Sequence, residues 1–183
     1  MPNAILDPTG QTGRSGAAAP LRLAPRRAQL AGARVGLLIN TKRNAAPFLT
    51  EVGRLLVDRH GAASITAHTK IAFAVPASEG ELKDLAAECD VVITGVGDCG
   101  SCSAAAVTDG IALEAHGIPA AVICSDAFGA SADAIAGLRG APGYRYVTTP
   151  HPVAVLTPEQ VRERAGQALA DVAALLTDGE SNG

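Results

Sequence analysis

Two of the chain's four cysteines stand close together, in the stretch GDCGSCS at residues 97–103. Cys99 and Cys102 follow an apolar run that is typical of a buried strand, and they precede a segment of helical character. A cysteine at the start of a helix meets unpaired backbone N–H groups and the positive end of the helix dipole. Both favour the thiolate, which is the reactive form of the side chain. The spacing therefore predicts thiol chemistry at this turn.

Four interpretations of this C-x-x-C stretch compete. A structural zinc site needs four ligands, so Cys124 and His151 would have to approach from the ends of other strands. Two buried apolar cysteines would sit poorly in a turn that also holds glycine and serine. A thioredoxin-type disulfide shuttle is the third interpretation, and a Cys99 nucleophile with Cys102 as its resolving thiol is the fourth. The last two share one chemistry, and we favour them over zinc and over burial.

The same turn offers groups that bind anions. The backbone N–H groups of Gly100, Ser101 and Ser103 can hold a substrate carboxylate or a developing oxyanion. Asp98 is a further candidate for substrate binding, although it opposes the Cys99 thiolate by its like charge. Its side chain fits a helix cap and a general base equally well, so both roles stay open.

Length and composition limit the kind of protein that carries this turn. A chain of 183 residues with 48% hydrophobic and 18% charged residues is long and apolar enough for one domain with a core. A net charge of −3 without a long basic run gives no support for a nucleic-acid partner. Apolar stretches fall short of the ~18 residues that span a bilayer, and the N-terminus lacks the pattern of a secretory signal. We therefore expect a cytoplasmic protein that does not bind membranes.

Apolar runs typical of strands alternate with helical stripes along most of the chain. Strands are expected at 33–40, 64–69, 90–97, 119–126 and 144–149, and helices at 46–61, 78–89, 102–117, 131–140 and 157–177. The alternation predicts an α/β fold, a single doubly wound parallel five-stranded sheet of flavodoxin or Rossmann type with strand order 2-1-3-4-5. This domain is expected over 33–177, after an irregular Gly- and Pro-rich N-terminal arm at 1–32 and before a flexible tail at 178–183.

In such a sheet, ligands bind beyond the carboxyl ends of the strands, where the strand order reverses. This rule brings the loop at 40–44 next to the cysteine turn at 97–102. The further candidate side chains follow the first, fourth and fifth strands: Asn40, Lys42, Asn44, Asp126, Phe128 and His151. Lys42 can pair with a substrate carboxylate or favour the thiolate, or it is a solvated lysine. His151 can act as acid or base, or it packs in a loop, while Asn40 and Asn44 fit substrate binding and turn chemistry alike.

Residues 91–128, from VVITGVGDCGSC to CSDAF, resemble the UGSC family of selenoproteins and their cysteine homologues. The family is named for a selenocysteine-Gly-Ser-Cys motif, and Cys99 occupies the selenocysteine position. Further pieces are similar to the family pattern: DPTG at 7–10, the asparagines and lysine of the 40–44 loop, the D-x-F at 126–128, and PHP at 150–152. The resemblance covers nearly the whole chain.

The UGSC family is distantly similar to the selenocysteine subunits of glycine and D-proline reductases. There a selenolate displaces an amine from a carbon next to a carboxylate, and a second thiol releases the product. The resemblance implies a cysteine-dependent enzyme in which Cys99 attacks a small carboxylate-bearing substrate and breaks a carbon–heteroatom bond, by a reductive or a lytic course.

We expect no cofactor and no metal, with an external thiol as the reductant, and we expect a homo-oligomer or a partner subunit. The alternative is a non-catalytic binding or carrier subunit of a reductase-type complex.

Overall fold

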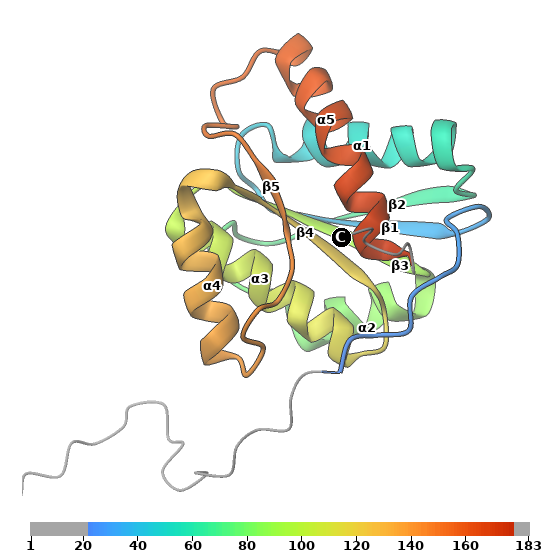
Figure 1. Ribbon diagram of the computed structural model, residues 1–183, viewed down its shortest axis with the longest axis horizontal. Coiled ribbons are helices and arrows are strands. Elements are labelled where there is room, and N and C mark those ends of the chain that lie inside the picture. Colours follow the sequence, from blue (N-terminus) through green and yellow to red (C-terminus); the bar gives the residue numbers. More distant parts are fainter. Residues whose placement is uncertain (1–21, 178–183) are drawn as a thin grey trace, which may run out of the picture.

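Strands and helices alternate through residues 22–177, the part of the chain that the computed structural model describes (Figure 1). The strands are β1 (Arg34–Ile39), β2 (Ser64–Thr69), β3 (Val91–Gly97), β4 (Ala120–Ser125) and β5 (Val147–Thr149). The helices are α1 (Ala45–His60), α2 (Glu79–Glu88), α3 (Gly100–Ala115), α4 (Gly129–Leu138) and α5 (Pro158–Leu176), with a short 3-10 helix η1 (Asp126–Phe128) before α4. The DPTG stretch, most of the predicted arm and the predicted tail lie outside the described residues.

The five strands form one parallel sheet in the order β2-β1-β3-β4-β5. This is the predicted order, with its reversal between β1 and β3. Ile39 near the end of β1 pairs with Gly95 of β3, so the loops that follow these two strands leave the sheet side by side. The sheet therefore places the loop at 40–44 and the cysteine turn at one edge.

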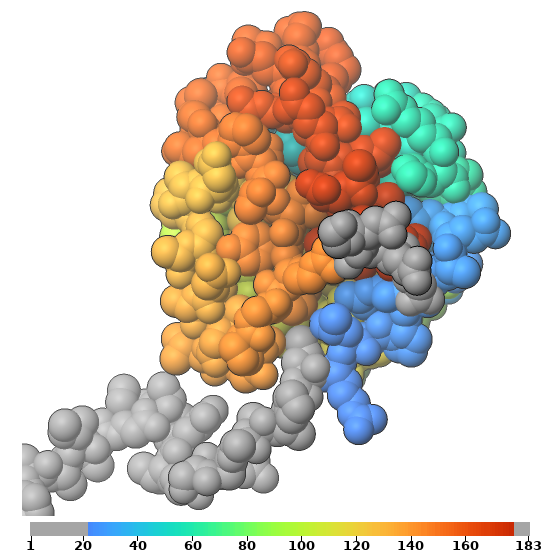
Figure 2. All heavy atoms as spheres, in the orientation of Figure 1, coloured from blue at the N-terminus to red at the C-terminus, as the bar shows by residue number. Residues whose placement is uncertain are grey.

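Helices cover both faces of the sheet (Figure 1). On one face, α1 and α5 bury residues such as Phe48 and Val172 against Leu37 and Ile93 of the strands. Figure 2 shows side chains of α5, in red, lying over this face. On the other face, α3 packs with α4 and with α2 in two smaller apolar clusters. No helix within residues 22–177 is long and apolar enough to cross a membrane.

The ends of the helices follow signals in the sequence. Ser78 and Glu81 form a capping box at the start of α2, and Thr157 and Gln160 form another at the start of α5. Gly61 ends α1 in the left-handed region at φ 70°, where a residue without Cβ is unstrained. These caps fix where the loops begin.

Two elements differ from their predicted bounds. The last strand was predicted at 144–149, but β5 holds three residues, because Tyr144 turns into the core between α3 and α4 instead of joining β4. Helix α3 begins at Gly100, two residues before the predicted start, because Cys99 takes the N-cap position.

The described part of the predicted arm is anchored rather than loose. The Glu114 carboxylate of α3 accepts both guanidinium N–H groups of Arg26 and the backbone N–H of Ala24. Arg27 forms a parallel β-bridge with Thr177 just after α5. These contacts hold residues 24–27 against the amino-terminal edge of the sheet, away from the cysteine turn.

Candidate active site

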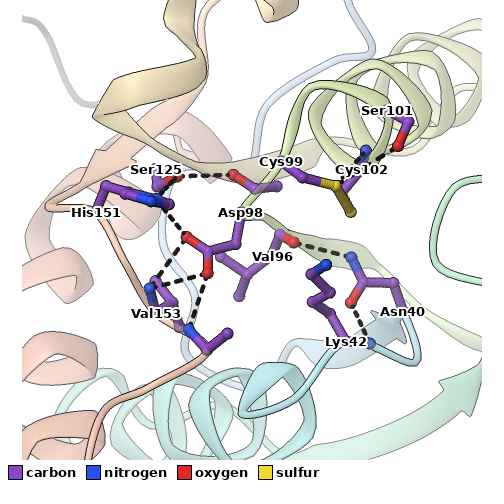
Figure 3. The surroundings of a disulfide bond; sticks show 12 residues. Asn40, Lys42, Val96, Asp98, Cys99, Ser101, Cys102, Ser125, His151 and Val153 are labelled. Atoms are coloured by element: carbon purple, nitrogen blue, oxygen red, sulfur yellow. Dashed lines mark hydrogen bonds and ion pairs between the residues drawn. A yellow bond between two sulfur atoms is a disulfide. The ribbon is translucent and has the colours of Figure 1, made fainter.

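The cysteine pair forms the first turn of α3. Cys99 is the N-cap, its Sγ accepts the backbone N–H of Cys102 at 3.3 Å, and a disulfide joins the two side chains across a Cα–Cα distance of 5.2 Å (Figure 3). Cys99 is half-buried, whereas Cys102 is fully buried. An incoming molecule can therefore reach the Cys99 sulfur, while the Cys102 sulfur is shielded behind it.

The backbone N–H groups of this turn divide into two kinds. The Ser103 N–H donates to the Cys99 carbonyl at 2.9 Å, and the Ser103 side chain is buried, so this predicted anion ligand serves the helix instead. Within residues 22–177, the N–H groups of Gly100 and Ser101 have no acceptor. The Ser101 side chain is exposed, with its Oγ 3.5 Å from the Cys99 sulfur. Two open N–H groups thus lie beside the more accessible sulfur.

Asn40 links the loop after β1 to the end of β3. Its buried side chain donates to the Val96 carbonyl at 2.9 Å and accepts the Lys42 backbone N–H at 3.1 Å (Figure 3). Asn44 acts similarly on the other side of the loop, since its amide donates to the Val153 and Leu156 carbonyls. Both asparagines hold backbone in place, so in this arrangement they position the edge of the site rather than face a ligand.

Lys42 lies in the loop after β1, which leaves the sheet beside the cysteine turn. Figure 3 shows its side chain extending from the loop after β1 toward the disulfide. Its ammonium lies 4.9 Å from the centre of the Phe73 ring, a cation–π distance. Phe73 belongs to the loop between β2 and α2, and no pattern in the sequence pointed to it.

Asp98 does not cap α3, because Cys99 occupies the N-cap and Asp98 still belongs to the turn that leaves β3. Its buried carboxylate instead accepts the backbone N–H groups of Val153 and Ala154 and the Nδ1 of His151, at 2.8 to 3.0 Å. Its negative charge is therefore compensated by donors from the segment after β5. The helix-cap interpretation of Asp98 is wrong, and the like-charge objection to a Cys99 thiolate loses weight.

His151 is held from several sides (Figure 3). Its Nδ1 lies 3.0 Å from Asp98 and 3.3 Å from the hydroxyl of Ser125 at the end of β4. The Phe128 ring meets the imidazole edge-on at a centroid distance of 5.3 Å, and the Asp126 carboxylate accepts the His151 backbone N–H at 3.0 Å. The predicted residues Asp126 and Phe128 thus hold the histidine in place. Ser125 is a further neighbour that was not predicted, although its position at the end of a strand could have indicated it.

The carboxyl edge of the sheet therefore gathers a thiol pair, two open backbone N–H groups, an ammonium and an oriented imidazole. The UGSC family model matches residues 4–178, across the whole described region. The chain belongs to the UGSC family. Its motif residues, Cys99 to Cys102, are the first turn of α3, so the family motif and the geometric site coincide. Both are compatible with thiol chemistry.

Other comparisons add little. No curated protein matches the chain. Among solved structures, the flavodoxin-like domain of a Synechococcus sp. protein is similar, with 14% sequence identity and a TM-score of 0.42, over 78% of this chain and 92% of that one. At that level the two are only loosely alike, and the strand order of this UGSC chain rests on its own sheet.

The other two cysteines lie apart from this chemistry. Cys89 and Cys124 are free and buried, and burial raises the pKa of both thiols, that of Cys124 to about 12. Residues 22–177 contain no group of three or more His, Cys, Asp or Glu side chains that could hold a metal ion. In the UGSC fold, the reactive sulfur at neutral pH is therefore expected to be that of Cys99.

Proposed function

We propose that this UGSC chain is a thiol-dependent enzyme that reductively cleaves a carbon–heteroatom bond in a small carboxylate-bearing substrate. The observation that carries the proposal is the asymmetric cysteine pair, in which a half-buried Cys99 at a helix N-terminus is bonded to a fully buried Cys102. A nucleophile needs access to substrate, and a resolving thiol needs only access to the nucleophile.

Two steps account for the pair. The Cys99 thiolate attacks the carbon next to the carboxylate, a carbon–sulfur bond forms, and the heteroatom leaves with the bonding electrons and takes up a proton. The Cys102 thiolate then attacks the Cys99 sulfur, so that the carbon leaves with its electron pair, takes up a proton and becomes C–H. The product enzyme holds the Cys99–Cys102 disulfide, which an external dithiol reduces by exchange. A lytic course would need no second thiol, so the paired cysteines favour the reductive one.

The carboxylate of the substrate would be held by Gly100, Ser101 and Lys42. The two open N–H groups stand at the positive end of the 16-residue helix α3, and Lys42 extends toward the same turn. Both features place positive potential beside the Cys99 sulfur, where it also favours the thiolate. His151 is the proton donor to the departing heteroatom in this scheme, with Asp126 and Phe128 at its border. Continued supply of a dithiol fits a cytoplasmic setting.

The test compares two alkylating agents of nearly equal size, iodoacetate and iodoacetamide, on the reduced protein. Only iodoacetate carries the carboxylate, so the rate ratio of iodoacetate to iodoacetamide at Cys99 should exceed that of free N-acetylcysteine by about tenfold, equivalent to ~1.4 kcal/mol. Lys42→Met should remove most of this preference. Lys83→Met, which removes an exposed lysine from α2, is the matched control and should keep it. A ratio equal to that of N-acetylcysteine would refute carboxylate recognition.

A second candidate function is that of a carrier subunit that presents the thiol pair to a partner chain. One observation favours it: the loop between β2 and α2 exposes three apolar side chains, with Ile71 95%, Val75 56% and Phe73 42% exposed. The iodoacetate experiment separates the two candidates, since a carrier without its own substrate site would show no carboxylate preference.

A further inference from the structure

The protonation pattern of His151 can be worked out from its neighbours. Nδ1 faces two groups, the Asp98 carboxylate at 3.0 Å and the Ser125 hydroxyl at 3.3 Å. The Ser125 hydroxyl donates its hydrogen to the Gly97 carbonyl at 3.2 Å, so toward Nδ1 it can only accept. An ionised carboxylate also only accepts. Two acceptors facing one ring nitrogen require that nitrogen to carry a hydrogen.

Asp98 itself has no freedom to turn away. Both of its oxygens accept the Val153 N–H at 3.0 Å, and one also accepts the Ala154 N–H at 2.8 Å. Its side chain is 2% exposed, so water does not compete for it. These donors lie two and three residues after His151, so the same short segment supplies the imidazole and the backbone that fixes its carboxylate.

We propose that Asp98 is a positioning residue that keeps a hydrogen on Nδ1 of His151 in both charge states, so that Nε2 is the only ring atom that gives or takes the catalytic proton. Nε2 makes no hydrogen bond to any group within residues 22–177, and the His151 side chain is 37% exposed. The ring is steadied from its edge by Phe128. The Asp126 carboxylate reaches the backbone N–H of His151 and not the ring.

This inference rests on the proposed function and adds the route of its proton. When Cys99 displaces the heteroatom, the Nε2–H bond of the imidazolium breaks and its proton passes to the departing heteroatom. The imidazole that remains is neutral and keeps its Nδ1 hydrogen. Water returns a proton to Nε2 before the next cycle. Two consecutive residues therefore supply the nucleophile, Cys99, and the carboxylate that positions the acid His151, Asp98.

The test reads the ring nitrogens directly, by long-range ¹H–¹⁵N NMR of histidine-labelled protein at a pH where the imidazoles are neutral. The signals of His151 are assigned by their loss in His151→Gln. His116 is the internal control, because it approaches the Glu79 carboxylate through Nε2 at 3.4 Å. We expect His151 to show the Nδ1–H form and His116 to show Nε2–H. Asp98→Asn should lower the Nδ1–H to Nε2–H ratio of His151 by about tenfold or more, because a hydrogen bond to a charged acceptor is lost.

The spectrum of the unmodified protein decides the matter even if Asp98→Asn does not fold. An Nε2–H form, or an even mixture, in that spectrum would overturn the inference, and so would an unchanged ratio in folded Asp98→Asn. The iodoacetate experiment reports on Cys99 and Lys42 and does not depend on the tautomer. Failure of the proton route and failure of the proposed function are therefore distinguishable.

Discussion

Lys70→Met should lower the stability of the protein strongly, because it leaves a buried carboxylate without its cation. The Lys70 ammonium at the end of β2 pairs with Asp109 of α3, and both side chains are at most 3% exposed. The other Asp109 oxygen accepts the Ala77 backbone N–H at 2.7 Å. One carboxylate thus fastens both ends of the loop between β2 and α2 to the helix that carries the cysteines.

The size of the effect follows from this burial. Removing one partner of a buried ion pair costs about 3–5 kcal/mol, whereas a whole domain is stable by about 5–15 kcal/mol. The double variant Lys70→Met/Asp109→Leu removes both charges and leaves only the Ala77 N–H without its acceptor, at about 1–3 kcal/mol. We therefore expect the double variant to be more stable than the single one.

Urea unfolding followed by circular dichroism gives the free energies of unfolding. Lys83→Met is the matched control, because Lys83 pairs with Glu79 on the surface, where both side chains are 65% exposed. Such exposed pairs contribute about 0–1 kcal/mol. Equal unfolding midpoints for Lys70→Met and Lys83→Met, or a double variant less stable than the single one, would show that Asp109 does not need the Lys70 ammonium.

The effect of Lys70→Met should also depend on pH. Burial raises the pKa of Asp109 above the ordinary value of 3.8, and the Lys70 ammonium opposes that rise. A raised pKa means that the folded state favours the protonated acid, so no stability is lost below pH 3.8 and the loss grows as pH rises through the folded value. Lys70→Met raises the pKa of Asp109 further. Its destabilisation should therefore be smaller below pH 3.8 than at neutral pH.

Two further predictions concern the packing beneath the cysteine turn. A Cβ at Gly97 would lie 2.6 Å from the Ser103 hydroxyl and 2.8 Å from the Cys124 sulfur, so Gly97→Ala should lower the free energy of unfolding by about 1–3 kcal/mol and slow the alkylation of Cys99. Gly137→Ala is the control, because a Cβ there lies in open space on α4 and should change neither quantity. An unchanged rate of Cys99 alkylation in Gly97→Ala would contradict this prediction. Cys124 should resist iodoacetamide in the folded protein, because burial raises its thiol pKa to about 12. In urea it should react at the rate of a free thiol. Mass spectrometry of the Cys124 peptide with and without urea measures both rates, and fast labelling of the folded protein would disprove the prediction.

Local pattern was enough to predict the frame of the site. The alternation of apolar runs and helical stripes indicated the strands and helices, and the general rules for doubly wound sheets then gave the strand order. The place of Cys99 at the start of a helix was also predicted from the apolar run before it and the helical segment after it. Each of these elements is indicated by residues only a few positions apart.

The hydrogen bonds between distant segments at the carboxyl edge of the sheet could not be predicted from local sequence patterns. Asp98 meets His151 across 53 positions, and Asn44 meets Val153 across 109, because the segment after β5 folds back over the end of the sheet. Nothing local in the sequence sets that path. The role of Asp98 and the contact of Ser125 with the imidazole both depend on it.

The most direct measurement is the order in which the four cysteines react after the disulfide is reduced. The reduced protein is treated briefly with substoichiometric iodoacetamide at neutral pH, and mass spectrometry of the peptides ranks the sites. We expect Cys99 to be modified first, ahead of the buried Cys102, with the buried Cys89 and Cys124 last. Labelling of Cys99 no faster than that of Cys89 or Cys124 would contradict a nucleophile at the head of α3.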